Sequence, residues 1–307
     1  MKTTAIIFTL VSLILVAFAA VAQLAAAAGT DLLVDNVWLA MHRPEVTLID
    51  VRDSDAYTKG HIPGAINIPV TSLRTKPDGL MVPVAVAEEL LGDKGLSIEK
   101  EVVLYGSGRE DAFLEFWMLD FLGMRRVNVL DGGIENVKGQ LSTAETGFAK
   151  SVFKAEPKLT ERADVDYVRK VLHKTSVNII DTRTPAEYKG EDVRALRGGH
   201  IPGAVNFDYA QNFQGDTTIL KPRIELANIY GRLDPEKETI VYCQTGARAS
   251  NGFFVLKELG FKKVRVYMPS WVEWGSRPDL PVDDVTYFNF VSILNKLSEL
   301  EKQKQNK

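Results

Sequence analysis

Cysteine is almost absent from this 307-residue chain, which contains one, Cys243. An intramolecular disulfide is therefore excluded, and so is a structural metal site built from several cysteines. Histidine is also scarce, with four residues, and no long block of like charge occurs, since 37 Lys and Arg stand against 40 Asp and Glu. The net charge of -3 offers no basic surface for nucleic acid, so we exclude this class of partner as well.

The first 28 residues differ in composition from the rest of the chain. Lys2 is followed by an apolar run over residues 5–22 and then by small residues, mostly alanine, up to Gly29. This order is typical of a secretory signal peptide, here with cleavage after Ala22 or after Ala28. An uncleaved anchor is the alternative, because the run is nearly long enough to span a bilayer. In both cases we expect export, to the periplasm, with a membrane contact only if the segment is retained.

The rest of the chain contains an internal repeat. Residues 34–50 (VDNVWLAMHRPEVTLID) align without a gap with residues 165–181 (VDYVRKVLHKTSVNIID). Two further blocks match in the same order, HIPGAIN at 61–67 with HIPGAVN at 200–206, and 102–137 with 239–274. Three collinear matches indicate a duplication. We assign copies to 31–145 and 161–284, a linker to 146–160 and a tail to 285–307.

The local patterns predict an α/β fold in each copy. Short apolar runs at 46–50, 101–105 and 127–130, with counterparts at 177–181, 239–242 and 264–267, indicate buried strands. Helical spacing over 112–122 and 249–259 ends at Gly123 and Gly260, which are typical residues at a helix end. The alternation predicts a mainly parallel sheet flanked by helices, with ligands at the carboxyl ends of the strands. Apolar spacing over 287–300 predicts an amphipathic helix in the tail.

Cys243 follows a predicted strand directly and precedes a predicted helix that begins near Ala249. Unpaired backbone N–H groups at a helix N-terminus stabilise negative charge, so this position favours a reactive thiolate. Gly246 and the small Ala247 let the backbone curl around the sulfur. Arg248 adds a fixed cation that can hold a bound oxyanion.

A lone cysteine is usually a small buried hydrophobe, so a structural role for the thiol is the alternative. The repeat distinguishes between the two roles. In the first copy, Cys243 corresponds to Gly106 and Arg248 corresponds to Asp111. The scaffold therefore folds without a cysteine at this place. We interpret Cys243 as a nucleophile present in one copy only.

Both copies carry D-x-R followed by G-H-I-P-G-A, and the second adds the loop C-Q-T-G-A-R and then W-x-x-W-G. With these motifs the chain resembles the tandem rhodanese family of sulfurtransferases over nearly its whole length after the leader. The resemblance implies an inactive first domain and a catalytic second domain. It also implies that the Cys243 thiolate takes a sulfane sulfur from thiosulfate, releases sulfite and hands the sulfur to cyanide or a thiol. Neither a metal nor an organic cofactor is needed.

The loop amides of Gln244, Thr245, Gly246, Ala247 and Arg248 are expected to surround the persulfide. By family similarity Arg183, in D-T-R, would help to bind the anionic oxygens of the donor. The first copy has the same D-x-R without a thiol, so a structural ion pair is the alternative. Arg197 and Arg194 lie in a segment that lengthens the second copy, which makes a site role for Arg197 plausible.

The remaining histidines and tryptophans favour structural roles. Each histidine has a counterpart in the copy without a thiol (His42 with His173, which we place on a helix, and His61 with His200), which argues against a papain-like Cys/His hydrolase. Trp271 and Trp274 are expected to pack rather than to line the site. In mercaptopyruvate sulfurtransferases, a histidine at the place of His61 is implicated near the site.

Three alternatives to a thiosulfate enzyme remain open. A mercaptopyruvate sulfurtransferase is weakened by the loop, which reads C-Q-T-G where those enzymes have C-G-S-G, although Thr245 retains a hydroxyl. A cysteine phosphatase or arsenate reductase has a wider loop with five residues between Cys and Arg, whereas four separate Cys243 from Arg248 here. A protein that carries or binds a persulfide without turnover is the third.

Overall fold

The structure, a computed structural model, describes residues 32–289 and consists of two α/β domains. Each domain is built on a five-stranded sheet in which all neighbouring strands are parallel. The two sheets have equivalent strand orders, as a duplication requires. The predicted α/β fold is confirmed, whereas the predicted signal peptide lies outside the described residues.

The strands follow the apolar runs of the sequence. The first sheet has the order β1-β5-β4-β2-β3, with β1 (Leu33–Val34), β5 (Arg126–Leu130), β4 (Glu101–Tyr105), β2 (Thr47–Asp50) and β3 (Ile66–Asn67). The second has the order β6-β11-β10-β7-β9, with β6 (Arg162–Ala163), β11 (Val264–Tyr267), β10 (Glu238–Tyr242), β7 (Val177–Asp181) and β9 (Val205–Asn206). Central strands are buried on both faces, which is why they read as uninterrupted apolar runs.

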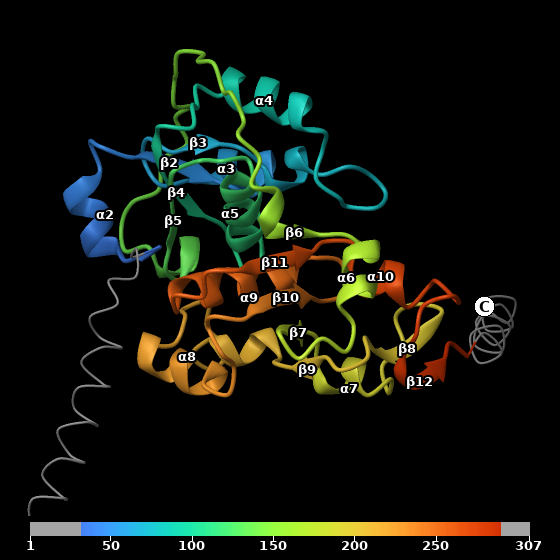
Figure 1. The fold of residues 1–307 in the computed structure, drawn as a ribbon. Helices are drawn as coiled ribbons and strands as arrows, with labels where there is room; N and C mark the ends of the chain where they lie inside the picture. Colours follow the sequence, from blue (N-terminus) through green and yellow to red (C-terminus); the bar gives the residue numbers. More distant parts are fainter. Residues whose placement is uncertain (1–31, 290–307) are drawn as a thin grey trace, which may run out of the picture.

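Helices connect the strands and cover the sheets (Figure 1). In the first domain they are α2 (Asn36–His42), α3 (Ser54–Lys59), α4 (Val84–Asp93) and α5 (Asp111–Phe121). In the second they are α6 (Val165–Val171), α7 (Pro185–Tyr188), α8 (Arg223–Tyr230), α9 (Ala247–Glu258) and α10 (Ser270–Trp274). In the described part of the chain, no helix is both long and apolar enough to cross a membrane.

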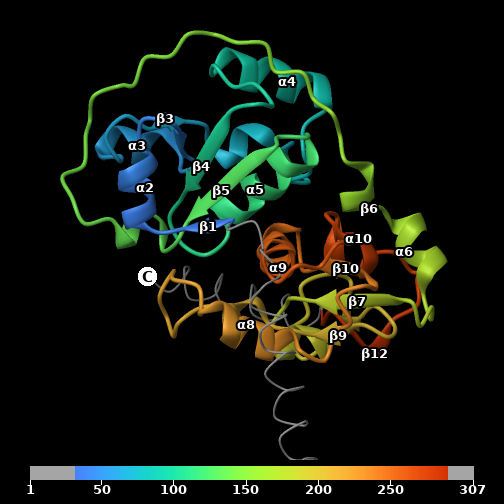
Figure 2. The same cartoon turned by 60° about the vertical axis from the view of Figure 1, so that its left-hand side comes forward.

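The equivalent helices α5 and α9 pack against each other where the two domains meet (Figures 1 and 2). Phe116 of α5 lies edge-on to Phe254 of α9, with ring centroids 4.8 Å apart. Both belong to one apolar cluster that continues from the first domain into the second. The domains therefore share a core, and this fixes the loop that follows β4 relative to the loop that follows β10.

Strand register brings equivalent residues to the carboxyl edge of each sheet. Asp181 at the end of β7 pairs with Tyr242 at the end of β10, as Asp50 pairs with Tyr105 in the first domain. The Tyr242 hydroxyl accepts a hydrogen bond from Ile201 N at 3.1 Å, which fixes the H-I-P-G turn beside the sheet. Cys243 comes next in the chain and therefore lies at this edge.

Three expectations need correction. Helix α9 begins at Ala247 rather than near Ala249, because Gly246 in a left-handed conformation (φ 93°) serves as its N-cap. His173 lies beyond α6, also in a left-handed conformation (φ 65°), and not on a helix. The first residues of the predicted helical tail belong to a strand, β12 (Asp283–Tyr287), which pairs antiparallel with β8 (Arg197–His200). The rest of that tail lies outside the described residues from residue 290 onward.

The predicted linker, residues 146–160, contains no helix or strand before a 3-10 turn at Leu159–Glu161. It runs around the outside of the first domain (Figure 2). Backbone bonds hold it there, from Ser151 N to Gly92 O and from Glu156 N to Leu122 O, both at 2.9 Å. The linker is thus part of the first domain's surface and not a free tether.

Candidate active site

Cys243 lies between the end of β10 and the start of α9, as the sequence predicts. Its side chain is almost completely enclosed, with 1% of the residue exposed. The amide of Gly246 donates a hydrogen bond to Sγ over 3.0 Å. Within residues 32–289 this is the one amide that donates a hydrogen bond to Sγ, and the predicted ring of amides around a persulfide sulfur stays a prediction. An amide at a helix N-terminus favours negative charge on the group to which it donates.

The loop conformation requires glycine at position 246. The residue has φ 93°, a region that side chains rarely adopt, and an added Cβ would lie 2.0 Å from Met268 Sδ and 2.9 Å from Met268 O. The main chain thus passes closely over Met268 and turns Gly246 N toward the thiol. The loop depends on this close approach for its shape.

Residues 270–272, at the start of α10, form hydrogen bonds with the backbone of the thiol loop, residues 243–248. Cys243 N donates to Ser270 Oγ over 3.1 Å, and Trp271 N donates to Cys243 O over 3.0 Å. Val272 N donates to Gln244 O, also over 3.0 Å. Ser270 adopts a left-handed conformation (φ 55°), a strained geometry that is common at functional sites. The backbone of the thiol loop is therefore preorganised.

Arg248 points to a buried carboxylate. Its Nη1 and Nη2 donate to Glu187 Oε2 and Oε1 over 2.7 and 2.8 Å, and Glu187 is completely buried. Burial opposes the charge of Arg248, but hydrogen bonding with Glu187 and the charges of Cys243, Glu187 and Glu110 raise the pKa of Arg248 above its usual value. Burial likewise opposes the charge of Glu187, yet Arg248 and Thr184 lower the pKa of Glu187 to about 2. Arg248 is therefore half of a fixed ion pair and not a free cation.

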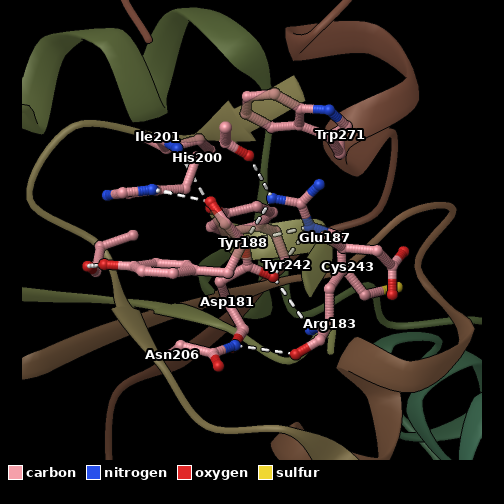
Figure 3. Close-up of polar contacts among 12 residues, drawn as sticks. Asp181, Arg183, Glu187, Tyr188, His200, Ile201, Asn206, Tyr242, Cys243 and Trp271 are labelled. Atoms are coloured by element: carbon pink, nitrogen blue, oxygen red, sulfur yellow. Dashed lines mark hydrogen bonds and ion pairs between the residues drawn. The ribbon is translucent and has the colours of Figure 1, made fainter. Parts of the chain in front are cut away.

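Arg183 has the same structural role as its counterpart in the first domain. Its guanidinium donates to Asp181 Oδ2 over 2.6 Å and to Gly199 O over 2.7 Å, and it faces the ring of Trp271 at 4.4 Å (Figure 3). In the first domain Arg52 makes the equivalent bonds to Asp50 and Gly60 O, at 2.6 and 2.7 Å. With 1% exposure and these partners, Arg183 holds the turn before β9, which agrees with the structural ion pair given above as the alternative to a role in donor binding.

Arg197 is likewise engaged elsewhere. Its side chain donates to four carbonyl oxygens, those of Trp274, Gly275, Arg277 and Leu280. These carbonyls lie at the last residue of α10 and in the segment that follows it. The expected site role for Arg197 is therefore replaced by a structural one, the anchoring of the C-terminal part of the domain.

The other loop residues lie where the sequence places them. Thr245 is exposed, Ala247 is buried in the first turn of α9, and Gln244 is half-buried. Gln244 Nε2 donates to Arg194 O over 2.9 Å, while its buried Oε1 has no hydrogen-bond partner in the described part of the chain. Gln244 thereby ties the thiol loop to the segment that lengthens the second copy.

Histidine is not part of the site. His61 is completely buried, with Nδ1 2.9 Å from Tyr57 O and Nε2 3.0 Å from Ala144 O, away from the thiol loop. His200 stacks on Tyr188 in the matching position, at 3.7 Å between centroids. Trp271 and Trp274 are completely buried, which confirms their predicted packing role. In residues 32–289, no group of three or more His, Cys, Asp and Glu residues could hold a metal ion.

Sequence reasoning missed Glu187 and named Arg194 without giving it a site role, although both lie close to Arg248. Glu187 is its partner, and Arg194 Nη1 lies 3.7 Å from Glu187 Oε1 with half of its side chain exposed. The signal was the comparison between copies, because Glu187 corresponds to Ala56 just as Arg248 corresponds to Asp111. Both members of the ion pair therefore belong to the copy with the thiol.

A cavity of about 310 Å³ opens at a different place, beside Asp120, Arg125 and Lys257 at the interface of α5 and α9. None of the thiol-loop residues lines it. Its charged walls are already paired, Lys257 with Glu161 and Arg125 with Glu99. The cavity contains no thiol, so we assign the active site to the Cys243 loop.

Comparison with known proteins agrees with this geometry. The rhodanese-like domain family matches the chain twice, at residues 33–140 and 164–277. The chain is 35% identical to the thiosulfate sulfurtransferase of Azotobacter vinelandii, over 78% of this chain and 92% of that one. It is 32% identical to the thiosulfate sulfurtransferase of Pseudomonas aeruginosa, with the same coverage.

Among solved structures, the fold is similar to the 3-mercaptopyruvate sulfotransferase SseA from Escherichia coli. The TM-score is 0.70 and the identity 27%, over 78% of this chain and 98% of that one. Two copies of one domain, a single thiol loop and these relatives lead to one assignment. The chain belongs to the rhodanese family, as an enzyme with two rhodanese-like domains and sulfurtransferase activity.

Proposed function

We propose that the enzyme moves a sulfane sulfur from thiosulfate, or a similar small donor, to cyanide or a thiol through a persulfide on Cys243. The observation that carries this proposal is the hydrogen bond from Gly246 N to Cys243 Sγ at the start of α9. The relatives named thiosulfate sulfurtransferase support the choice of donor. The near-complete enclosure of Cys243 supports a small one.

In the first step the Cys243 thiolate attacks the outer sulfur of thiosulfate. A new S–S bond forms, the S–S bond of the donor breaks, and sulfite leaves with the electron pair. The terminal sulfur of the persulfide is then an anion at the N-terminus of α9, where the helix dipole and the unpaired amides favour negative charge. In the second step an acceptor attacks this sulfur, the S–S bond to Cys243 breaks, and the thiolate is restored.

The ion pair of Arg248 and Glu187 has a positioning role in this proposal. Glu187 leaves three N–H groups of the guanidinium for other partners, because Arg carries five donors in a fixed plane. The pair therefore holds the guanidinium beside the loop, where its remaining N–H groups donate hydrogen bonds to the oxygens of thiosulfate. Arg194, the other cation at Glu187, reaches the same region from the exposed side.

A single experiment tests the reaction. The protein is incubated with thiosulfate and its intact mass is measured, before and after addition of cyanide. We expect the mass of one sulfur atom to appear at Cys243 and to disappear as thiocyanate forms. Cys243→Ala, as the control, gains no sulfur. A labelled protein that makes no thiocyanate would instead be a persulfide carrier, and an unlabelled protein would overturn the proposal.

The main alternative is 3-mercaptopyruvate as donor, which the Escherichia coli relative favours. Its carboxylate would need a cation beside the loop, and Arg194 is the exposed one. We propose thiosulfate as the better donor because the more similar relatives carry that name. A ratio of kcat/KM for the two donors decides between them.

We also propose export to the periplasm, supported by the composition of residues 1–28. Determination of the N-terminus of the protein isolated from cells tests this. A new N-terminus at Gln23 or Gly29, in an exported fraction, is expected. An intact leader in a cytosolic fraction would contradict it.

A further inference from the structure

The loop of the first domain that corresponds to the thiol loop, with the sequence GSGRED, docks onto the second domain. Arg109 of this silent loop donates from Nε to Thr217 O over 2.7 Å and from Nη2 to Gly215 O over 2.6 Å. Its guanidinium also lies 4.8 Å from the centre of the Phe213 ring. One side chain of the silent loop therefore binds residues 213–217 of the catalytic domain.

Phe213 and Tyr209 connect the silent loop with Arg248. The Phe213 ring packs edge-on against the Tyr209 ring, with centroids 6.2 Å apart. The centre of the Tyr209 ring lies 5.9 Å from the Arg248 guanidinium, which is within the range of a cation–π contact. Glu187 binds the same guanidinium in two hydrogen bonds. An unbroken series of contacts thus leads from Arg109 to the cation that is paired with Glu187.

The residues of this series differ between the two copies. In the alignment of the HIPGA motifs, Tyr209 corresponds to Val70 and Phe213 corresponds to Arg74, and β-bridges at equivalent places in both copies support this alignment. The arginine of the silent loop stands where the thiol loop has Gly246. The aromatic pair therefore occurs in the copy with the thiol, and the arginine that holds it occurs in the other copy.

We propose that Arg109, supplied by the domain without a thiol, is a positioning residue for sulfur transfer. Through Phe213 it keeps the Tyr209 ring at the Arg248 guanidinium, so that this cation stays in the orientation that binds the anionic donor. The proposal rests on the sulfur-transfer function proposed above. A guanidinium without this support loses more conformational freedom when the donor binds, so binding weakens while the attack by Cys243 is unaffected.

Arg109→Met tests the proposal, because it removes the two hydrogen bonds and the cation but keeps an unbranched side chain. Thr218 Oγ1 still donates to Gly132 O over 2.8 Å and holds the same segment to the first domain. We expect KM for thiosulfate to rise about fivefold and kcat to change less than about twofold. Arg109→Lys, which keeps a cation near Phe213 and can donate to a carbonyl, should raise KM only about twofold, and it replaces Arg109→Met if that variant does not fold.

Lys257→Met is the matched control, because it disturbs the same domain contact beside a cavity that the thiol loop does not line. It should leave KM unaltered. An unchanged KM in both Arg109 variants would overturn the proposal. So would an equal rise of KM in Lys257→Met, since the effect would then come from the packing of the domains.

A double-mutant cycle distinguishes action through Tyr209 from a direct attraction of the donor by the charge of Arg109. In the Tyr209→Leu background, Arg109→Met should cause no further rise of KM, because the ring through which Arg109 acts is absent. The same rise of KM in both backgrounds would mean that Arg109 acts on the donor directly, and the positioning role would be wrong.

Another readout does not depend on sulfur transfer. Cys243, the one thiol of the chain, is alkylated with iodoacetate, an anion, or with iodoacetamide, which is neutral. The ratio of the two rates reports how well Arg248 presents its charge at the thiol. In Arg109→Met we expect this ratio to fall about threefold, and in the Tyr209→Leu background to stay constant. If no donor turns over but the ratio changes in this way, the proposed function fails and the role of Arg109 stands. An unchanged ratio in Arg109→Met overturns the role of Arg109.

Discussion

Asp120 and Lys257 occupy equivalent positions in the two copies and form an ion pair with each other. Asp120 Oδ2 lies 3.4 Å from Lys257 Nζ, across the contact between α5 and α9. Two identical copies would bring like charges together at this place. The divergence of the duplicated domains therefore produced opposite charges where the helices meet, and this ion pair stabilises the packing of the two domains against each other.

Lys257→Met tests this relationship. Lys257 also donates to Glu161 Oε1 over 2.8 Å, so its loss leaves two largely buried carboxylates with less compensation. We expect the free energy of unfolding to fall by about 2–3 kcal/mol, below the range for a fully buried pair because a quarter of the lysine side chain is exposed and Lys158 still pairs with Asp120. Urea unfolding measures it. Lys262→Met, in an exposed pair with Glu236, should cost less than about 1 kcal/mol. If both variants lost the same free energy of unfolding, the pair of Asp120 and Lys257 would contribute no more than an exposed ion pair.

The ion pair of Arg248 and Glu187 gives the second prediction. Arg248→Met leaves the completely buried Glu187 carboxylate without its cation, and we expect a loss of about 3 kcal/mol of stability together with most of the sulfur-transfer activity. The double variant Arg248→Met, Glu187→Met replaces both charges by apolar groups. It should regain most of the stability and none of the activity. A stable but inactive Arg248→Met single variant would mean that Glu187 finds another partner.

The pH dependence of stability follows from the pKa of Glu187. The folded value, about 2, lies below the usual 4.5, so the pair contributes fully above about pH 4.5 and its contribution is lost as the pH falls toward 2. Glu187→Gln removes this ionisation. The difference in unfolding free energy between the parent protein and this variant should therefore shrink steadily from pH 5 to pH 3. A constant difference over that range would contradict the assignment.

The sequence predicted the bounds of the strands, but it did not predict the hydrogen-bond partners of Arg183 and Arg197. Strands such as Val177–Asp181 have the predicted bounds, because uninterrupted apolar runs mark buried parallel strands. The roles of Arg183 and Arg197 depend on carbonyls such as Gly199 O and Leu280 O, which only the folded chain brings within reach. Family similarity and position could not reveal these partners.

Local backbone geometry explains the other differences. Helix α9 begins two residues earlier than its apolar spacing suggests, because the left-handed Gly246 sets the start. Strand β12 is polar and mostly exposed, so it lacks the apolar alternation by which a strand is recognised. Glu187 was missed because its buried position depends on a four-residue helix, α7, that has no periodicity of its own.

Glu115 gives an opposite pH dependence in the first domain. It is completely buried in α5, and within the described residues neither carboxylate oxygen has a hydrogen-bond partner. Burial, and then the charges of Asp111 and Asp50, raise the pKa of Glu115 well above its usual 4.5. The unfolded chain releases this proton above about pH 4.5 while the folded chain keeps it, so stability falls as the pH rises.

Glu115→Gln isolates this effect, since the amide stays neutral. The variant should equal the parent protein near pH 4 and exceed it increasingly up to pH 8, as measured by thermal or urea unfolding. Glu89→Gln, at an exposed site on α4, should leave the pH profile unaltered. If the difference in stability between the parent protein and Glu115→Gln did not change with pH, Glu115 would ionise in the folded protein as it does in the unfolded chain.

Gly246 precedes α9 and Gly260 follows it, and the two residues have almost the same left-handed φ, 93° and 91°. A Cβ at Gly260 would meet nothing within 4 Å, whereas one at Gly246 would lie 2.0 Å from Met268 Sδ. Gly260→Ala should therefore cost only the backbone strain, about 1 kcal/mol, and keep full activity. Gly246→Ala must displace the loop and move its amide from Cys243 Sγ, so we expect sulfur transfer to fall by a factor of about 100 or more. Activity assays and unfolding curves of the two variants measure both effects. If Gly246→Ala remained active, the amide of Gly246 would not be needed to stabilise the thiolate.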